Sequence, residues 1–244
     1  MARNREFLVQ LENFHHETYI ASQYLYAGMA VQHAASKSSA LLDRLNESPG
    51  FWSVQMAATQ TAAYITLGRI FDTTSKYNVD ALLDSFEANL RLFSRNSLEA
   101  RKSVGCLSRP GWLDAYLIKA HYPNAVDVAR LRTHVKRHRE FYDRAVKPVR
   151  HKHLAHREKQ EISEVQELYG RGTVKELWKT VTFLLALHEA LLQQHMNGRK
   201  PILKPLRHSV KVIYDNDHDN DNGRTGPHEV IVRETRSLMN RLQK

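Results

Sequence analysis

The chain has 244 residues, carries a net charge of +10 and has a pI near 9.7. This length suits one large domain or two small ones, and the single cysteine, Cys106, excludes an internal disulfide and a Cys-rich zinc module. No apolar run approaches the length of a membrane span, and the first residues lack the apolar core of a signal peptide. We therefore expect a cytoplasmic protein without membrane insertion. The charge favours a polyanionic partner, although a basic surface alone does not separate RNA, DNA, anionic lipid and acidic proteins.

Ten Gly and seven Pro are few for this length, and their scarcity favours helices throughout the chain. The first predicted helix covers residues 4–34, where apolar side chains recur at steps of three and four residues. A short helix over 38–46 ends before the Ser48-Pro49-Gly50 break. The helix predicted over 51–71 is apolar on most sides, which indicates a central, buried position.

The helical pattern continues through the middle of the chain. Asn78 is expected to cap a helix that runs to Phe93. Residues 96–103 follow as a polar helix or an ordered loop, and a short helix is predicted over 112–120.

Residues 128–145 trace a long helix with one apolar stripe and basic residues on its other faces. His138 lies on this stripe, and His188 lies on the stripe of a later helix, so both are expected to be structural. Pro148 should kink the long helix or begin the next one. In the second case, the N-terminal amides of the new helix would lie beside Arg150 and add to an anion site.

The last strong apolar stripe, over residues 174–195, predicts a helix that ends at Gly198. The composition then changes. Residues 215–223 read DNDHDNDNG, whose glycine falls one place late for a calcium loop, and residues 229–242 are predicted as a terminal helix. The chain therefore divides into a helical domain, residues 1–198, and a C-terminal extension with an acidic loop and a terminal helix, residues 199–244.

Most of the positive charge lies in one stretch, residues 130–159. It holds eleven Lys and Arg and five of the fourteen His against three acidic residues, a net charge of +8 with His neutral. Such a stretch suits a phosphodiester substrate, because Arg and Lys hold the phosphate while His can move protons. The residues expected to contact nucleic acid without doing chemistry are Lys147, Lys152, His153 and Arg157.

A metal site is the main alternative for this stretch, since His151, His153 and His156 offer three ligands. However, His151 and His153 lie about 200° apart on a helix. No carboxylate or cysteine completes the set, and the surrounding cations would repel a divalent ion. We therefore expect no metal and no cofactor.

The same stretch resembles a known family. Arg150-His151, four further residues and His156 match the signature of HEPN ribonuclease domains: an arginine, a polar residue, and a histidine a few residues on. More narrowly, RHKHLAHRE resembles the AbiU-type abortive-infection branch. The stretch Leu67-Gly68-Arg69-Ile70-Phe71-Asp72 is similar to the Arg-Ile-Phe-Asp stretch that such proteins carry on an earlier helix. The resemblance covers roughly residues 5 to 197 and leaves the C-terminal extension unmatched.

The resemblance implies an all-α, HEPN-like helical bundle, here with a short helical C-terminal extension, that forms a homodimer with two motifs in a shared cleft. It also implies metal-independent RNA cleavage, in which His156 assists attack by the ribose 2′-hydroxyl and Arg150 holds the scissile phosphate. His151 is then the polar motif position, and Arg69 and Asp72 give structural support. Glu158 stands where nucleotidylated HEPN toxins have tyrosine, so that control is not expected.

The geometry of an α-helix bears on this site, because Arg150 and His156, six residues apart, point about 240° apart. Either the helix starts irregularly after Pro148, or two copies meet across a dimer.

Three functions stay open: an RNA-cleaving toxin or defence effector, a non-catalytic HEPN dimer that binds RNA or acts as a scaffold, and DNA binding through residues 130–144 without any recognisable helix-turn-helix. An antitoxin or defence partner protein is a further expected partner, which the sequence does not identify.

Overall fold

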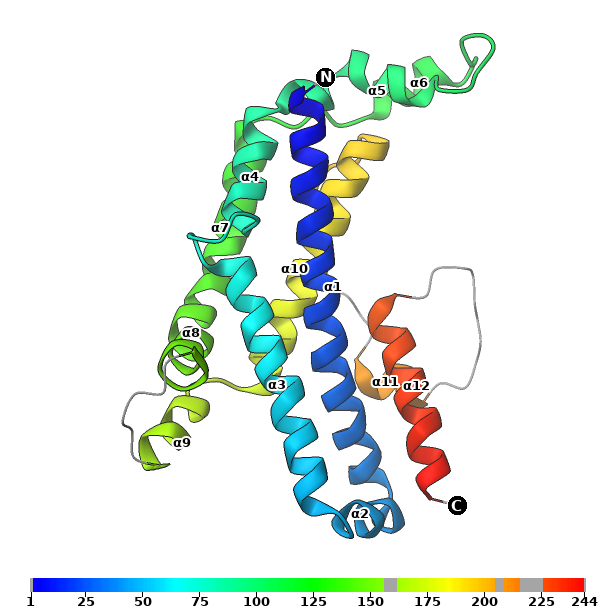
Figure 1. The fold of residues 1–244 in the computed structure, drawn as a ribbon. Coiled ribbons are helices and arrows are strands. Elements are labelled where there is room, and N and C mark those ends of the chain that lie inside the picture. Colours follow the sequence, from blue (N-terminus) through cyan, green and yellow to red (C-terminus); the bar gives the residue numbers. More distant parts are fainter. Residues whose placement is uncertain (1, 156–161, 205–208, 216–225, 244) are drawn as a thin grey trace.

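The computed structural model describes the chain except for residues 1, 156–161, 205–208, 216–225 and 244. Every regular element in the described residues is a helix, which confirms the predicted all-α class. The helices form an elongated bundle (Figure 1). In this described part, no helix has both the length and the apolarity that crossing a bilayer requires.

Helix α1, Ala2–Lys37, forms the axis of the bundle. It packs against α3 (Pro49–Phe71), α4 (Val79–Ala88), α10 (Val174–Asn197) and α12 (Pro227–Leu242). Figure 1 shows α1 running between α3 on one side and α12 on the other. A single long helix therefore connects the main bundle to the C-terminal extension.

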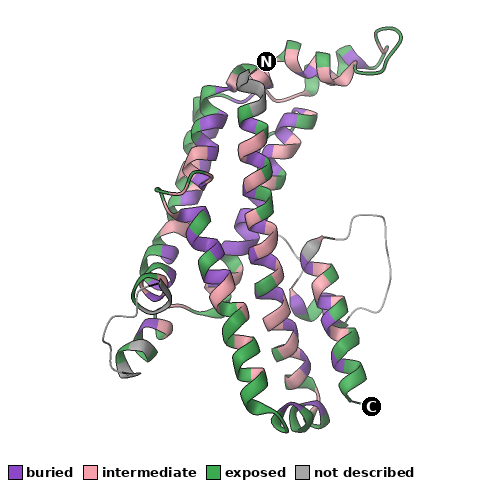
Figure 2. Cartoon of the chain, viewed as in Figure 1, coloured by how far each residue is buried: buried purple, intermediate pink, exposed green. Residues whose placement is uncertain are grey.

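The main core gathers the apolar stripes of α1, α3, α4, α7 (Ala125–Phe141) and α10. Phe14, Leu67, Leu83 and Leu184 are fully buried there. Figure 2 shows the buried residues on the faces that the helices turn toward one another. Each such side chain contributes about 1.5–3 kcal/mol of hydrophobic stabilisation, so the core sets the position of these helices.

The helix ends follow the polar and glycine residues that the sequence offers. Asn78 begins α4, and its Oδ1 accepts a hydrogen bond from Ala81 N at 2.8 Å. Ser38 caps α2 (Ser39–Asn46) in the same way. Gly198 ends α10 with a left-handed φ of 57°, which a residue without Cβ adopts at low cost. These predicted boundaries are confirmed.

The chain after α4 departs in detail from the prediction. The helix expected to reach Phe93 ends at Ala88, and a 3-10 turn, η1, covers Leu90–Phe93. Helices α5 (Arg95–Lys102) and α6 (Leu113–Lys119) form an arm at one end of the bundle (Figure 1). Tyr116 on this arm donates its hydroxyl hydrogen to the carbonyl oxygen of Asn197 at 2.8 Å, which fastens the arm to the end of α10.

Helix α3 is less buried than its composition predicts. Its second half, from Ala63 on, buries one face in the core, whereas Phe51 and Val54 in the first half are 57% and 64% exposed. Figure 1 shows that α1 and α3 extend together beyond the main bundle, with α2 at their far end. The predicted central position is therefore wrong for the first half of α3, because an apolar helix is buried only where other helices surround it.

The helical run that starts as α7 continues through Pro148. It passes into a π-helix, η2, over Tyr142–Val146, a short α turn, α8, over Lys147–Val149, and a second π-helix, η3, over Arg150–Ala155. Helix α9 follows over Ile162–Gly170. The run changes direction at α8 (Figure 1), as expected where a proline and π-turns interrupt the α-helical ladder.

The backbone hydrogen bonds explain how Pro148 is accommodated. Lys147 N–H donates to the carbonyl of Tyr142, five residues back, so the ladder widens directly before the residue that has no N–H. Arg150 N–H in turn donates to the carbonyl of Lys147. The expectation of a new helix with free amides beside Arg150 is therefore wrong.

The C-terminal extension packs onto α1 and builds a second core cluster. Helices α11 (Val210–Asp215) and α12 both contact α1 and each other, and the predicted terminal helix is confirmed as α12. Tyr26 of α1 lies in this cluster and accepts a hydrogen bond from Trp178 Nε1 at 2.9 Å. The segment that reads DNDHDNDNG lies mostly outside the described residues, and the division into two parts at residue 198 stays a prediction.

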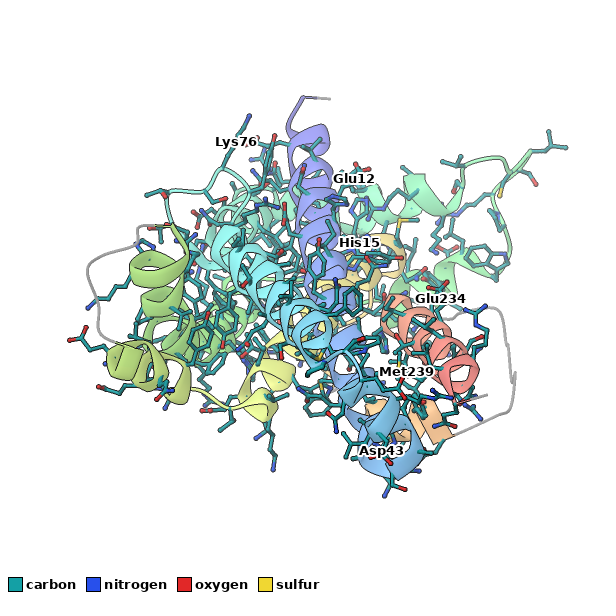
Figure 3. All side chains as sticks on the ribbon, turned by 60° about the horizontal axis from the view of Figure 1, so that its bottom comes forward. Glu12, His15, Asp43, Lys76, Glu234 and Met239 are labelled. Carbon is teal, nitrogen blue, oxygen red and sulfur yellow. The ribbon has the colours of Figure 1, made fainter. Side chains whose placement is uncertain are left out.

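The second core cluster generates a stability prediction. Met239, on α12 beside α1 (Figure 3), is fully buried, whereas its neighbour Leu238 is exposed. We expect Met239→Ala to lower the free energy of unfolding by about 2–4 kcal/mol, because it removes buried methylene and sulfur contacts and leaves a cavity. Leu238→Ala should change it by less than about 0.5 kcal/mol. Urea unfolding of both variants measures the difference, and equal values would show that α12 does not stabilise the fold.

Candidate site around Arg150

The predicted motif arginine is held at the junction of two helical elements. Arg150, in η3, directs its guanidinium to the end of α3, where Nη2 donates to Asp72 Oδ2 at 2.6 Å. The Arg150 side chain is only 18% exposed and that of Asp72 is 26% exposed. A charge-assisted hydrogen bond that is this short and partly shielded from water is stronger than a typical surface ion pair.

Gly68 makes room for this arginine in the last turn of α3. A Cβ at this position would lie 2.3 Å from Arg150 Nη1 and 2.7 Å from its Cδ. Gly68 has an ordinary helical φ, so its backbone conformation does not require glycine. The close approach of the Arg150 side chain does require it, because any larger residue would push the guanidinium away.

The carboxylate of Asp72 is held in place by hydrogen bonds as well as by its ion pair with Arg150. Its Oδ1 accepts hydrogen bonds from Thr74 N at 3.2 Å and from Thr74 Oγ1 at 3.0 Å. The hydrogen bond from Arg150, together with those from Thr74, lowers the pKa of Asp72 to about 2. The carboxylate therefore stays ionised at any pH at which the protein is expected to work.

Tyr142 completes the surroundings of Arg150. Its ring is buried and stacks on Phe71 with centroids 5.3 Å apart, and burial raises the pKa of its hydroxyl to about 12. Within the described residues, neither this hydroxyl nor Arg150 Nε has a hydrogen-bond partner. Buried polar groups without partners are uncommon in folded proteins.

The structure describes some of the other predicted site residues and not others. His151 is exposed, and its Nε2 lies 2.7 Å from Arg150 Nη2, so this nitrogen accepts the hydrogen bond when the imidazole proton is on Nδ1. Lys147 and Lys152 are exposed. His153 lies in η3 without a described side chain. His156 and Arg157 lie outside the described residues, so the structure brings Arg150 and His151 together with Asp72 and does not test the distance to His156.

The basic stretch carries less unpaired charge than its sequence suggests. Of its nine described Lys and Arg, six form ion pairs with carboxylates, five of them with residues outside the stretch. The six are Arg130, Arg132, Arg139, Arg144, Lys147 and Arg150. Lys136, Arg137 and Lys152 form no ion pair with a described residue. Much of the net +8 is therefore neutralised by other elements of the fold.

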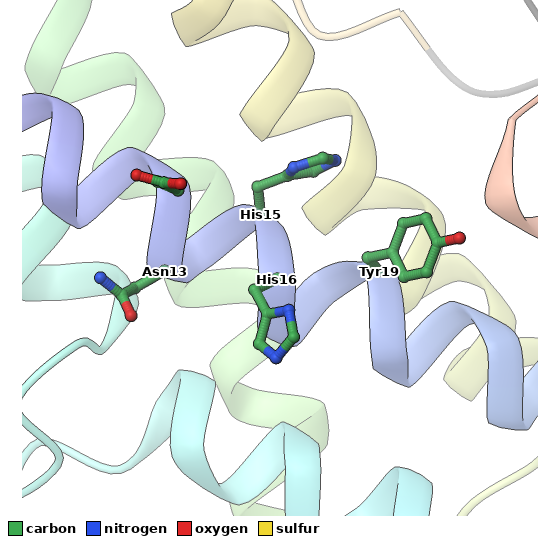
Figure 4. Close-up of a pocket in the computed structure, with 5 residues that line it drawn as sticks. Asn13, His15, His16 and Tyr19 are labelled. Carbon is green, nitrogen blue, oxygen red and sulfur yellow. The ribbon is translucent and has the colours of Figure 1, made fainter.

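A second group of polar residues lies on α1 (Figure 4). Its members, Glu12, Asn13, His15, His16 and Tyr19, all come from this one helix, so they form a shallow surface and not a cleft between elements. His15 stacks on His188 of α10 with centroids 4.1 Å apart. Among the described residues, no three His, Cys, Asp or Glu side chains are close enough to hold a metal ion.

The two histidines expected to be structural have the environments of packed residues. His138 stacks on Phe183 at 4.0 Å, and its Nδ1 lies 3.1 Å from Thr180 Oγ1. Burial lowers the pKa of His138 to about 4, and burial with a smaller effect of His15 lowers that of His188 to about 4. Both side chains are therefore neutral near pH 7 and hold helices together.

Sequence reasoning identified Arg150, His151 and Asp72 but missed Gly68 and Tyr142 as parts of the site. A glycine between Leu67 and Arg69 in an otherwise continuous helical pattern was a signal for Gly68. Tyr142 gave no such signal, because it continues the apolar stripe of α7.

Comparison with known proteins supports the resemblance read from the motifs. A family model, HEPN_AbiU2, described as AbiU2, matches residues 5–222. The matched range includes the ends of α3 and α7 and the whole setting of Arg150, and it leaves α12 unmatched. No curated protein and no solved structure matches the chain significantly.

The buried histidines generate a prediction about acid stability. The folded-state pKa of His188, about 4, lies below its ordinary value of 6.5, so the unfolded chain binds more protons between these pH values. Stability should therefore fall as the pH falls through this window. We expect His188→Phe, which keeps an aromatic ring against His15, to lose less thermal stability than wild type between pH 7 and pH 4.5, by about 1–3 kcal/mol. Identical pH profiles of the melting temperature would show that His188 is not a buried neutral histidine.

Proposed function

The chain belongs to the AbiU2 family of HEPN proteins, and we propose from this that it is a metal-independent endoribonuclease that acts in the cytoplasm as a toxin or phage-defence effector. The observation that carries the proposal is the setting of Arg150. A guanidinium held between Asp72 and Gly68, in the motif position, has a fixed direction that a scaffold protein does not need.

The proposed chemistry uses the substrate's own nucleophile. His156 accepts the proton of the ribose 2′-hydroxyl, which attacks the adjacent phosphorus. The bond to the 5′-oxygen of the next nucleotide breaks, and the departing oxygen takes up a proton from water. Arg150 binds the scissile phosphate and stabilises the negative charge that develops on its oxygens. The products are a 2′,3′-cyclic phosphate, or its hydrolysed form, and a 5′-hydroxyl. His151 orients the arginine through the contact with Nη2.

RNA is proposed to lie along the exposed cations near this site. Lys147 in α8 and Lys152 in η3 are exposed, and His153 and Arg157 follow in the chain. Since most cations of the stretch are already paired with carboxylates, phosphate contacts are few. Arg150 is itself paired with Asp72, so it contributes through the fixed direction of its remaining N–H donors.

The proposed homodimer has a suitable surface on α3. No charged residue lies between Glu47 and Arg69, and the outer face of this segment exposes Phe51, Val54 and Ile65. Two copies of a chain with a net charge of +10 repel each other unless they meet through an uncharged face. A two-fold contact buries the same apolar face on both copies, so we propose that α3 contacts α3 of the second copy.

The first test of this function is cleavage of RNA by the purified protein. We expect cleavage in the presence of EDTA, because no step uses a metal ion, and no cleavage of a substrate with 2′-deoxyribose at the scissile position. Arg150→Ala and His156→Ala should each lose activity by at least about 100-fold. Mass spectrometry of the 5′ fragment should show the cyclic phosphate or its hydrolysed product.

The control for this test is His188→Phe, which replaces a histidine outside the motif and should retain cleavage. If EDTA abolishes activity, or if the deoxyribose substrate is cut as fast as RNA, the metal site formed by His151, His153 and His156 becomes the better explanation. A folded wild type that binds RNA without cutting it would instead indicate the non-catalytic HEPN module.

The second test concerns the dimer. We expect light scattering to show a dimer for wild type at micromolar concentration and a monomer for Val54→Glu, since the charge would be buried without a partner. Ile118→Glu is the matched control, because Ile118 is an exposed apolar residue on the arm, far along the chain from α3. A dimer in both variants would exclude the α3 face, and a monomeric wild type would exclude the dimer itself.

A further inference from the structure

Arg150 combines two properties that rarely occur together in a surface cation. Its side chain is 18% exposed and its Nε is buried, and it nevertheless lies in the motif that is expected to meet RNA. A charge in this position is stable only if a partner of opposite charge is fixed beside it. The partner and the space that Arg150 occupies both come from α3, a helix far from Arg150 in the sequence.

Two contacts from α3 define where the guanidinium can lie. Asp72 accepts the hydrogen bond from Nη2, and the backbone of α3 at Gly68 lies against Nη1 and the side-chain carbons. Asp72 is itself held by Thr74. The backbone at Gly68 limits how closely the arginine side chain can approach α3, and the hydrogen bond to Asp72 fixes one edge of the guanidinium.

We propose that Gly68 and Asp72 form a guanidinium seat, and that Asp72 is a positioning residue that aims Arg150 at the scissile phosphate. The seat is a property of the folded chain, whereas the target of the aimed arginine rests on the proposed function. Arginine has five N–H donors in a planar fork, so binding of one edge by a carboxylate leaves the remaining donors in a fixed direction. A phosphate then meets a group that has already lost its rotational freedom.

A simple ion pair on the surface would not need these features. It would tolerate alanine at the position of Gly68 and would gain little from a second group that fixes the carboxylate. The helix accepts a glycine here, although glycine is less favourable than alanine in a helix interior. That cost is offset by the room for Arg150.

The decisive experiment tests the seat without relying on cleavage. Arg150→Ala removes the side chain and leaves the space between Gly68 and Asp72, which methylguanidinium can fill. We expect millimolar methylguanidinium to raise the melting temperature of Arg150→Ala in a saturable way, because it binds the folded state only. Methylammonium, which has the same charge without the planar fork, should raise it less.

Matched double variants assign the effect to the two seat residues. Arg150→Ala with Asp72→Asn keeps the shape of the seat but removes its charge, and Arg150→Ala with Gly68→Ala fills the space with a Cβ. Neither should respond to methylguanidinium. If both respond as strongly as Arg150→Ala alone, the cation binds elsewhere and the seat is excluded.

Cleavage then tests the positioning role. In the wild-type background, Asp72→Asn should lower kcat by about 10- to 100-fold with a smaller change in KM, since a misdirected guanidinium stabilises the transition state less well than the bound substrate. Methylguanidinium should partly restore cleavage to Arg150→Ala. If wild type cuts RNA and Asp72→Asn cuts it equally fast, the positioning role is wrong. If wild type does not cut RNA but the thermal shifts occur, the proposed function fails and the seat remains.

Where Arg150→Ala does not fold, Arg150→Met offers a second route. The methionine occupies the space along Gly68 with an uncharged chain and leaves Asp72 without a cation. The pKa of Asp72 should then rise from about 2 toward its ordinary value of 3.8, because the largest cause of its depression is gone. A carbon-detected NMR titration of the Asp72 carboxyl measures this rise, and an unchanged pKa would exclude Arg150 as its partner.

Discussion

The partial burial of one positive charge constrains the junction between α3 and the helical run that carries Arg150. Arg150 lies mostly out of water, and its guanidinium must therefore meet a carboxylate in a fixed place. Asp72 provides it directly after α3 ends, and Phe71 beside it stacks on Tyr142 of the helical run that carries Arg150. The ion pair forms only if α3 and the helical run that carries Arg150 keep a fixed position relative to each other. The contacts that bury the apolar core hold both elements in place, so these contacts also position Arg150 and Asp72.

The π-helices explain why the geometry around Arg150 could not be read from the sequence. The 240° separation between Arg150 and His156 assumes an α-helix, whereas η3 from Arg150 to Ala155 has wider turns and rotates each residue by less. The apolar residues from Val128 to Ala145 predicted a helix correctly, because burial fixes their period. The period gives no warning of the widened ladder, although Pro148 signals an interruption of the helix close by.

Local sequence signals predicted the helices and their ends well, but they did not predict which charged residues pair across the fold. Asn78 and Gly198 mark helix ends through their own backbone geometry, so sequence alone identified both boundaries. The net charge of the basic stretch was also counted correctly, but its partners Asp72, Asp80 and Glu176 lie on other elements. Counting charge along the chain ignores neutralisation across the fold, which is why the unpaired positive surface is smaller than predicted.

Helix α3 links the two features on which the proposed activity depends. Its exposed first half carries the uncharged face offered to a second copy, and its last turn carries Gly68 and leads into Asp72. A helix of 23 residues whose only proline lies in its first turn is stiff over this length. A contact that shifts the first half of α3 therefore also displaces the seat of Arg150. In the proposed homodimer, the contact between the two α3 helices would therefore be coupled to the direction of the Arg150 guanidinium through one rigid helix.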